Sequence, residues 1–164
     1  MQMIRIESLE EKHRMAVIDI FNYYVEHKNS AYPQTKVGYE AFDMFLENAK
    51  HLCGYAITSE NGEILGFCQL KPYRPQSTFE RTVEVTYFLK ESATGKGIGK
   101  EILEYLIQDA KRLGKKHILA SISGDNAVSL KFHKNNGFTE CGRFKNIGNK
   151  FGKEFDIVYM QKEI

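Results

Sequence analysis

Tryptophan is absent from the 164-residue sequence, and proline and cysteine occur only three times each. The cysteines, Cys53, Cys68 and Cys141, are odd in number and far apart, without the CxxC or Cys/His spacing of a ligand set. A disulfide framework and a zinc site are therefore not indicated, and we expect no metal. All three thiols are expected to be buried as small hydrophobic groups.

A strong excess of charge is also missing. The formal net charge of +2 is too small to indicate nucleic acid or an anionic membrane as a partner, and no basic tract contains interleaved aromatic residues. The N-terminal stretch MQMIRIESLEEKHRMAV has no uninterrupted apolar core, and no later segment approaches the length of a membrane span. These absences predict a soluble, cytoplasmic protein.

The first quarter of the chain predicts a strand and two helices. A short strand is expected over Met3–Ile6, and Ser8 with Glu11 forms a plausible capping box for a helix that ends near Val25. A polar loop follows, and helical periodicity returns over residues 39–50.

From there the sequence predicts mainly strands. CGYAITSE and EILGFCQL, joined by an Asn-Gly turn, predict a hairpin, and TVEVTYFL is typical of a central strand. The later elements are a helix from Ile98 to a C-cap at Gly114, a strand KHILASIS, a helix from Asp125 or Asn126 to Asn136, and strands around FTECGRF and FDIVYMQ. This mixed order favours a single α/β or α+β domain over residues 1–164, with a mixed sheet.

A glycine-rich loop, GKGIG at Gly95–Gly99, lies between the central strand and the long helix. It does not match a Walker A loop, because Thr94 replaces the first glycine and Glu101 replaces the hydroxyl residue after Lys100. The dinucleotide fingerprint fails as well. The remaining interpretations are a pyrophosphate site on backbone amides, with charge from Lys96 and Lys100, and a turn that needs glycine only for its dihedral angles.

The surrounding segments favour the phosphate interpretation. The strand, GKGIG loop, helix and terminal SGDNAVSLKFHKNNGFTECGRFKNIGNKFGKEFDIVYMQ resemble the GNAT superfamily of acetyl-CoA-dependent N-acetyltransferases, and in particular its phosphinothricin N-acetyltransferase group. IFNYYV and YRPQSTFERTVEVTYFL extend the resemblance over nearly the whole chain. The chain departs from the group at Thr94, at Tyr32 in place of a Phe, at Lys153-Glu154 in place of an Arg-Trp pair, and within YRPQSTFER. Several of these changes are expected on the acceptor side.

The resemblance implies the GNAT fold, a central mixed, splayed β-sheet flanked by helices, with acetyl-CoA as co-substrate and a homodimer as the assembly. It places pantetheine along the strand Val83–Leu89 and pyrophosphate on the Gly95–Gly99 amides. The residues it implies for acetyl-CoA binding are Tyr87, Phe88, Leu89, Gly95, Lys96, Gly97, Ile98, Gly99, Lys100, Asn126 and Ser129.

Two residues are candidates for proton transfer. Glu84 is a carboxylate in an otherwise apolar strand and, given the resemblance, is our candidate base, acting through water; a backbone N–H of the same strand would hold the oxyanion. The alternative is a solvent-facing Glu84 or one paired with Arg81. His133, where many superfamily members have Tyr, is the candidate acid or relay for the thiolate; the alternative is a helical histidine that only stacks on its neighbours.

For the acceptor, Arg74 and Arg81 suit an amino-acid carboxylate or phosphinate, while Tyr32, Tyr73 and Phe79 could wall the pocket. The alternatives are solvated arginines and core aromatics. We therefore expect acetyl transfer to a small amino-acid-like amine, of the phosphinothricin, methionine sulfone or methionine sulfoximine type. Acetylation of another amine (a polyamine, an antibiotic or a protein N-terminus), a non-catalytic acyl-CoA-binding module and a glycine-loop nucleotide binder remain open.

Overall fold

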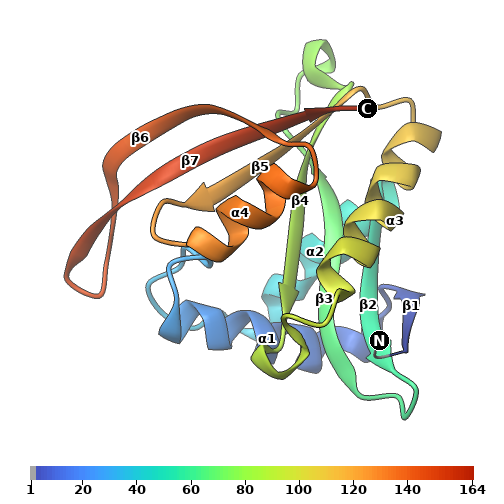
Figure 1. Cartoon of the computed structure of the whole chain (residues 1–164). Helices are drawn as coiled ribbons and strands as arrows, with labels where there is room; N and C mark the ends of the chain where they lie inside the picture. The colour runs from blue at the N-terminus through green and yellow to red at the C-terminus, as the bar shows by residue number, and fades with distance from the viewer. Residues whose placement is uncertain (1–2) are drawn as a thin grey trace.

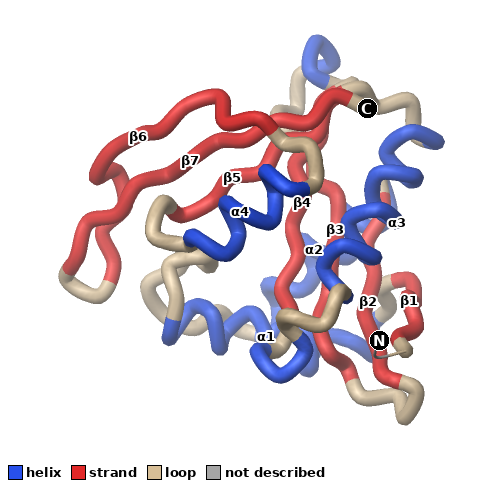
Figure 2. Tube along the Cα trace, in the orientation of Figure 1, coloured by secondary structure: helices blue, strands red, loops and turns tan. Residues whose placement is uncertain are grey.

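A computed structural model describes residues 3–164 as one seven-stranded sheet with helices on both faces (Figures 1 and 2). The strand order is β1-β2-β3-β4-β5-β7-β6, and all neighbours are antiparallel except the parallel pair β4–β5. The strands are β1 (Ile4–Ser8), β2 (Cys53–Ser59), β3 (Ile64–Pro72), β4 (Thr82–Leu89), β5 (His117–Ser123), β6 (Thr139–Lys150) and β7 (Lys153–Glu163). The α-helices are α1 (Arg14–His27), α2 (Phe42–His51), α3 (Ile98–Arg112) and α4 (Ala127–Asn135), and the short 3-10 helices are η1 (Glu11–His13), η2 (Tyr39–Ala41), η3 (Ser77–Phe79) and η4 (Glu91–Ala93).

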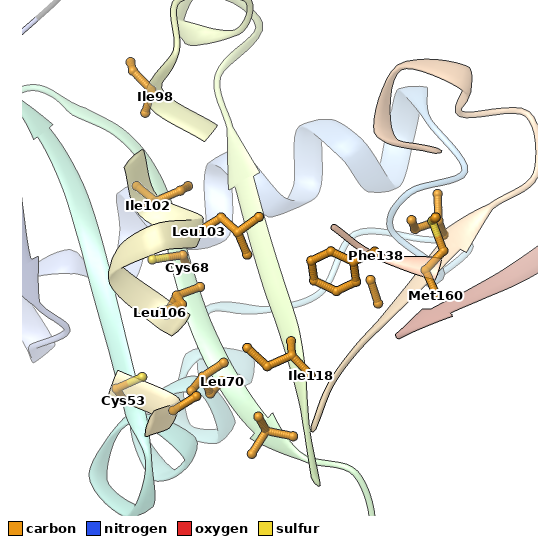
Figure 3. Close-up of a cluster of buried hydrophobic side chains, with 14 of the residues drawn as sticks. Cys53, Cys68, Leu70, Ile98, Ile102, Leu103, Leu106, Ile118, Phe138 and Met160 are labelled. Carbon is orange, nitrogen blue, oxygen red and sulfur yellow. The ribbon is translucent and has the colours of Figure 1, made fainter. Parts of the chain in front are cut away.

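The sheet separates two apolar cores. On one face, the buried stripe of α3 packs with α4 against the strands, as Figure 3 shows for Ile102, Leu103 and Leu106. On the other face, α1 and α2 pack against the sheet around Phe42 and Phe67. Because side chains alternate between the faces of a strand, this division assigns each strand residue to one of the two sides.

The sheet opens between β4 and β5. These strands pair only from Thr82↔His117 to Glu84↔Leu119, although β4 continues to Leu89. The Lys90 N–H donates to the Leu65 carbonyl on the β3 side, and antiparallel backbone groups alternate in direction along a strand. The N–H and C=O groups of Val85, Tyr87 and Leu89 therefore face the gap, which confirms the predicted mixed, splayed sheet.

All predicted helices and strands are confirmed, with two local corrections. Ser8 does not begin the capping box, because it is still paired in β1; Glu10 and His13 form the box instead, at the start of η1. Cys141 is exposed, because it lies on β6, the edge strand of the sheet, whereas Cys53 and Cys68 are buried as predicted. Within residues 3–164, no helix is both long and apolar enough to span a membrane.

Candidate active site

The glycine loop presents bare backbone at the start of α3. Gly95 and Gly97 have φ values of 72° and 83°, which a side chain would strain, and Gly97 is the N-cap of α3 without a side-chain hydrogen bond. The first N–H groups of an α-helix have no acceptor within the helix. Lys96 and Lys100 are exposed beside them, and Ile98 is buried beneath the loop. Amides at a helix N-terminus with two nearby cations fit the pyrophosphate of a CoA ester.

The open edge of β4 lies next to this loop. Its alternation brings the side chains of Tyr87 and Leu89 to the α3 and α4 face, whereas Phe88 points to the opposite core and packs on Phe21 with ring centroids 5.4 Å apart. Tyr24, which the sequence did not single out, donates its hydroxyl to the Leu89 carbonyl. The exposed peptide groups of an unpaired strand edge can bond an extended amide chain such as pantetheine.

His133 is buried, with 2% of its surface exposed, and both ring nitrogens have partners. Nδ1 lies 2.7 Å from the Ser129 carbonyl oxygen, to which it must donate, so Nε2 accepts from the Tyr87 hydroxyl. Burial lowers the pKa of His133 and raises that of Tyr87. The arrangement therefore favours a neutral imidazole that touches β4 through Tyr87.

The start of α4 supports this pair. Asn126 is the N-cap, and its side-chain oxygen accepts from the Ser129 N–H at 3.1 Å. Ser129 also places its hydroxyl 3.3 Å from His133 Nδ1. Asn126, Ser129 and His133 thus form one connected group beside the gap.

Glu84 lies on the opposite face of the sheet, the face of Phe88. Its side chain is 14% exposed, and its carboxylate pairs with Lys71 Nζ at 3.1 Å. The partner is therefore Lys71, which the sequence did not single out, and not Arg81. Glu84 is the last β4 residue that pairs with β5, so its carboxylate stands where the sheet begins to open.

Tyr32 reaches this face from the loop after α1. Its hydroxyl lies 2.9 Å from Ser121 Oγ, and Ser121 is paired in register with Tyr159. Desolvation raises the pKa of Tyr32, the hydrogen bond to Ser121 opposes this, and the charges of Tyr159 and Glu84 add to the increase. Ser121 and Tyr159 thus line the face of the sheet that carries Glu84, and only strand alternation in the sequence could have indicated them.

The segment between β3 and β4 supplies the remaining candidates. The Arg74 guanidinium lies 5.2 Å from the centre of the Tyr73 ring, and Phe79 packs edge-to-face on Tyr73 at 5.5 Å. The hydrogen bond and charge of Tyr73, and to a smaller extent the charge of Tyr159, raise the pKa of Arg74. Arg81 is exposed at the start of β4, where its carbonyl accepts from the N–H groups that begin β5.

No cluster of three or more His, Cys, Asp or Glu side chains that could hold a metal occurs in the described part of the chain. The site thus combines three features around the gap in the sheet. The Glu84 carboxylate lies on one face, and the N-terminus of α3 lies on the other face, next to the unpaired edge of β4. Such an arrangement can hold an extended acyl carrier in the gap and remove a proton from a nucleophile that approaches from the Glu84 side.

The sequence profile of the acetyltransferase (GNAT) domain matches residues 6–159. The chain therefore belongs to the GNAT acetyltransferase family, and it is an acetyltransferase. It is 31% identical to an L-methionine sulfoximine/L-methionine sulfone acetyltransferase of Salmonella typhimurium, over 91% of this chain and 88% of that one.

Two solved structures are similar along nearly their whole length. A ribosomal-protein-alanine N-acetyltransferase from Brucella melitensis has 31% identity and a TM-score of 0.88, with 99% of both chains covered. An acetyltransferase from Salmonella typhimurium with its cofactor acetyl-CoA has 28% identity and a TM-score of 0.88, covering 98% of this chain and 93% of that one. These comparisons confirm the predicted family and fold.

Proposed function

We propose that this protein transfers the acetyl group of acetyl-CoA to the α-amine of a small amino-acid-like compound such as phosphinothricin, methionine sulfone or methionine sulfoximine. The observation that carries the proposal is the position of Glu84, where the sheet opens opposite the unpaired edge of β4. The name of the Salmonella typhimurium relative supports the acceptor class. We further propose a cytoplasmic, single-domain chain over residues 1–164.

The donor is held by the backbone. The amides of Gly95–Gly99 bind the pyrophosphate, with Lys96 and Lys100 adding charge. The backbone groups of Val85 and Tyr87, with the Leu89 N–H, bond the pantetheine, because the Leu89 carbonyl already accepts from Tyr24. Asn126 and Ser129 contribute from the start of α4. When bound, acetyl-CoA supplies an activated thioester carbonyl next to the acceptor.

Glu84 is the general base. An ammonium has no lone pair, so the acceptor must lose a proton before it attacks, and the carboxylate takes this proton through a water molecule. A backbone N–H at the open edge of β4, of which Val85 is the first after Glu84, stabilises the negative oxygen. Lys71 holds the carboxylate on this face.

His133 is assigned to the departing thiolate. Because its Nε2 accepts from Tyr87, the imidazole orients the Tyr87 hydroxyl, whose proton passes to the departing sulfur. The Tyr87 oxygen then regains a proton from water, and the imidazole stays neutral throughout. Replacing Tyr87 by Phe should therefore interrupt the transfer as fully as replacing His133.

Arg74 and Arg81 are assigned to the acid group of the acceptor, with Tyr32 and Phe79 as walls of the acceptor pocket.

A second candidate function is acetylation of a protein N-terminus, which the name of the Brucella melitensis enzyme favours. Arg74→Ala discriminates between the two candidates. It should reduce activity on methionine sulfone by about 10- to 100-fold, because one charge-assisted hydrogen bond is lost, and should spare a peptide that begins with alanine.

The first test is acetyl-CoA-dependent thiol release with methionine sulfone and phosphinothricin, alongside a polyamine and an alanine-starting peptide. Turnover of the first two compounds supports the proposed acceptor. Turnover of the peptide alone supports the second candidate, and stabilisation by CoA without any turnover would support a binding module.

We also propose that the protein is a homodimer. Phe144, Ile147 and Phe151 are more than half exposed on and beside the long hairpin of β6 and β7, where a second copy could cover them. Analytical ultracentrifugation of the wild type tests this, with an expected mass of two chains.

A further inference from the structure

Lys150 is a buried cation in a part of the molecule that the catalytic scheme does not use. It is the last residue of β6 and is only 2% exposed. Lysine is almost never fully buried unless its ammonium group has partners. Here Nζ donates to the carbonyl oxygens of Ala31 at 2.6 Å and Lys28 at 2.8 Å, and lies 4.9 Å from the centre of the Phe151 ring.

Both carbonyl groups belong to the loop that delivers Tyr32. This loop, residues 28–38, lies between α1 and η2 and contains neither helix nor strand, so no regular ladder fixes its backbone. Ala31 is buried and directly precedes Tyr32. Two bonds from one ammonium group therefore fix the backbone at the base of the Tyr32 side chain.

Further contacts extend the same attachment. Gln34 Nε2 donates to the Asn149 carbonyl at 3.3 Å, and Asn29 Nδ2 donates to Asp125 at 2.8 Å. The Tyr32 ring lies 6.4 Å from that of Phe155, and its hydroxyl reaches Ser121. The loop is thus held against β5 and the β6–β7 hairpin, whose length beyond β5 is visible in Figure 1.

Lys150 cannot act on the reacting atoms themselves. It pairs in register with Lys153, whereas the position opposite Leu119 and Glu84 is Gln161. Eight residues of strand separate these positions, about 26 Å along the hairpin at about 3.3 Å per residue.

We propose that Lys150 is a positioning residue for acceptor binding: it fixes the loop of residues 28–38 so that Tyr32 forms one wall of the acceptor pocket opposite Glu84. The inference rests on the proposed function, because it takes the Glu84 face as the acceptor side. Loss of Lys150 should weaken acceptor binding and leave donor binding and the chemical step largely unchanged.

The test compares Lys150→Met with Lys153→Met, which removes the same charge from an exposed side chain opposite it on the hairpin. Lys150→Met should raise the acceptor KM about tenfold, since a small displacement of a pocket wall has effects of this order, while kcat and the acetyl-CoA KM stay within about twofold. Lys153→Met should change none of the three. An unchanged acceptor KM in Lys150→Met, or an equal increase in Lys153→Met, would overturn the proposal.

A double-mutant cycle with Tyr32→Phe separates positioning from general loss of structure. If Lys150 acts through the Tyr32 contact with Ser121, then Lys150→Met in the Tyr32→Phe background should raise the acceptor KM by less than about twofold. A full tenfold increase in both backgrounds would contradict this route.

If Lys150→Met folds poorly, Lys150→Arg provides a second variant, because it keeps the charge and the donors and should retain the wild-type acceptor KM. A tenfold increase of the acceptor KM in Lys150→Arg would count against the proposal.

Hydrogen exchange provides a readout that does not depend on the acceptor. Amides of residues 28–34 should exchange faster in Lys150→Met than in Lys153→Met, whereas those of α3 should not change. If the wild type acetylates neither methionine sulfone nor phosphinothricin, the proposed acceptor class fails. Unchanged exchange of the loop would instead refute the attachment by Lys150.

Discussion

The two faces of the sheet are built differently, although both meet at the gap between β4 and β5. The face proposed for the donor uses backbone: a glycine loop, a helix N-terminus and an unpaired strand edge, all within residues 85–99. The face proposed for the acceptor uses side chains from distant segments, as in the contact of Tyr32 with Ser121, 89 residues away. Backbone geometry tolerates side-chain substitution, so this division allows one donor to be combined with different acceptors.

The largest difference between the faces should appear on removing the base. Glu84→Gln keeps the size of the side chain but removes its basicity, so kcat should fall by about 10²- to 10⁴-fold, the usual contribution of a general base. CoA affinity, measured by calorimetry, should stay within about twofold. Glu80→Gln removes an exposed carboxylate from the neighbouring loop and should retain wild-type kcat; a fall in CoA affinity for Glu84→Gln would contradict the separation of the faces.

The backbone of the glycine loop and β4 could be predicted from the sequence more directly than the side-chain contacts around Glu84 and Tyr32. Gly95–Gly99 and the strand before it are contiguous, and glycine spacing at the start of a helix has a direct backbone meaning. The ion pair of Glu84 with Lys71 and the contact of Tyr32 with Ser121 depend on strand register and loop path. Neither strand register nor loop path can be predicted directly from the sequence. Arg81 was therefore considered as the ion-pair partner of Glu84, whereas in the structure this partner is Lys71.

The second prediction concerns the backbone of the donor face. Gly97→Ala places a side chain at φ 83°, where an L residue is strained by about 1–2 kcal/mol. Relief of this strain would turn the loop amides away from the pyrophosphate, so the Kd for CoA should rise about tenfold in calorimetry, with the acceptor KM unchanged.

Gly62→Ala is the matched control for this strain. Gly62 has φ 82° in the turn between β2 and β3, and a Cβ there meets nothing within 4 Å. It should lower Tm by an amount similar to that for Gly97→Ala while the CoA affinity remains that of the wild type. A wild-type Kd in Gly97→Ala would show that the loop does not need its left-handed geometry to bind CoA.

A smaller effect is expected at Tyr87, which joins β4 to α4. Tyr87→Phe removes the donor to His133 Nε2 and leaves a buried acceptor unpaired, which should cost about 1–3 kcal/mol in urea unfolding and reduce kcat about tenfold. Tyr55→Phe is the control, since Tyr55 donates to Asp109 at 2.5 Å on the same face but away from the gap. Equal loss of kcat in both variants would mean that the effect comes from stability and not from the relay.

The smallest effect should be the pH dependence that His133 adds to stability. Burial lowers its pKa in the folded state below the ordinary value of about 6.5 that the unfolded chain retains. The unfolded state then binds more protons just below pH 6.5, so the contribution to stability is complete above that pH and is lost as the pH falls toward the folded-state pKa.

The free energy of unfolding of the wild type should accordingly decrease from pH 7.5 to 5.5 by more than that of His133→Gln. His27→Gln removes an exposed imidazole by the same substitution and is the matched control. A wild-type curve that falls less steeply than that of His133→Gln would mean that the imidazole holds its proton more tightly in the folded protein, and the acceptor role of Nε2 toward Tyr87 would have to be abandoned. Parallel curves would mean that burial does not shift the pKa of His133.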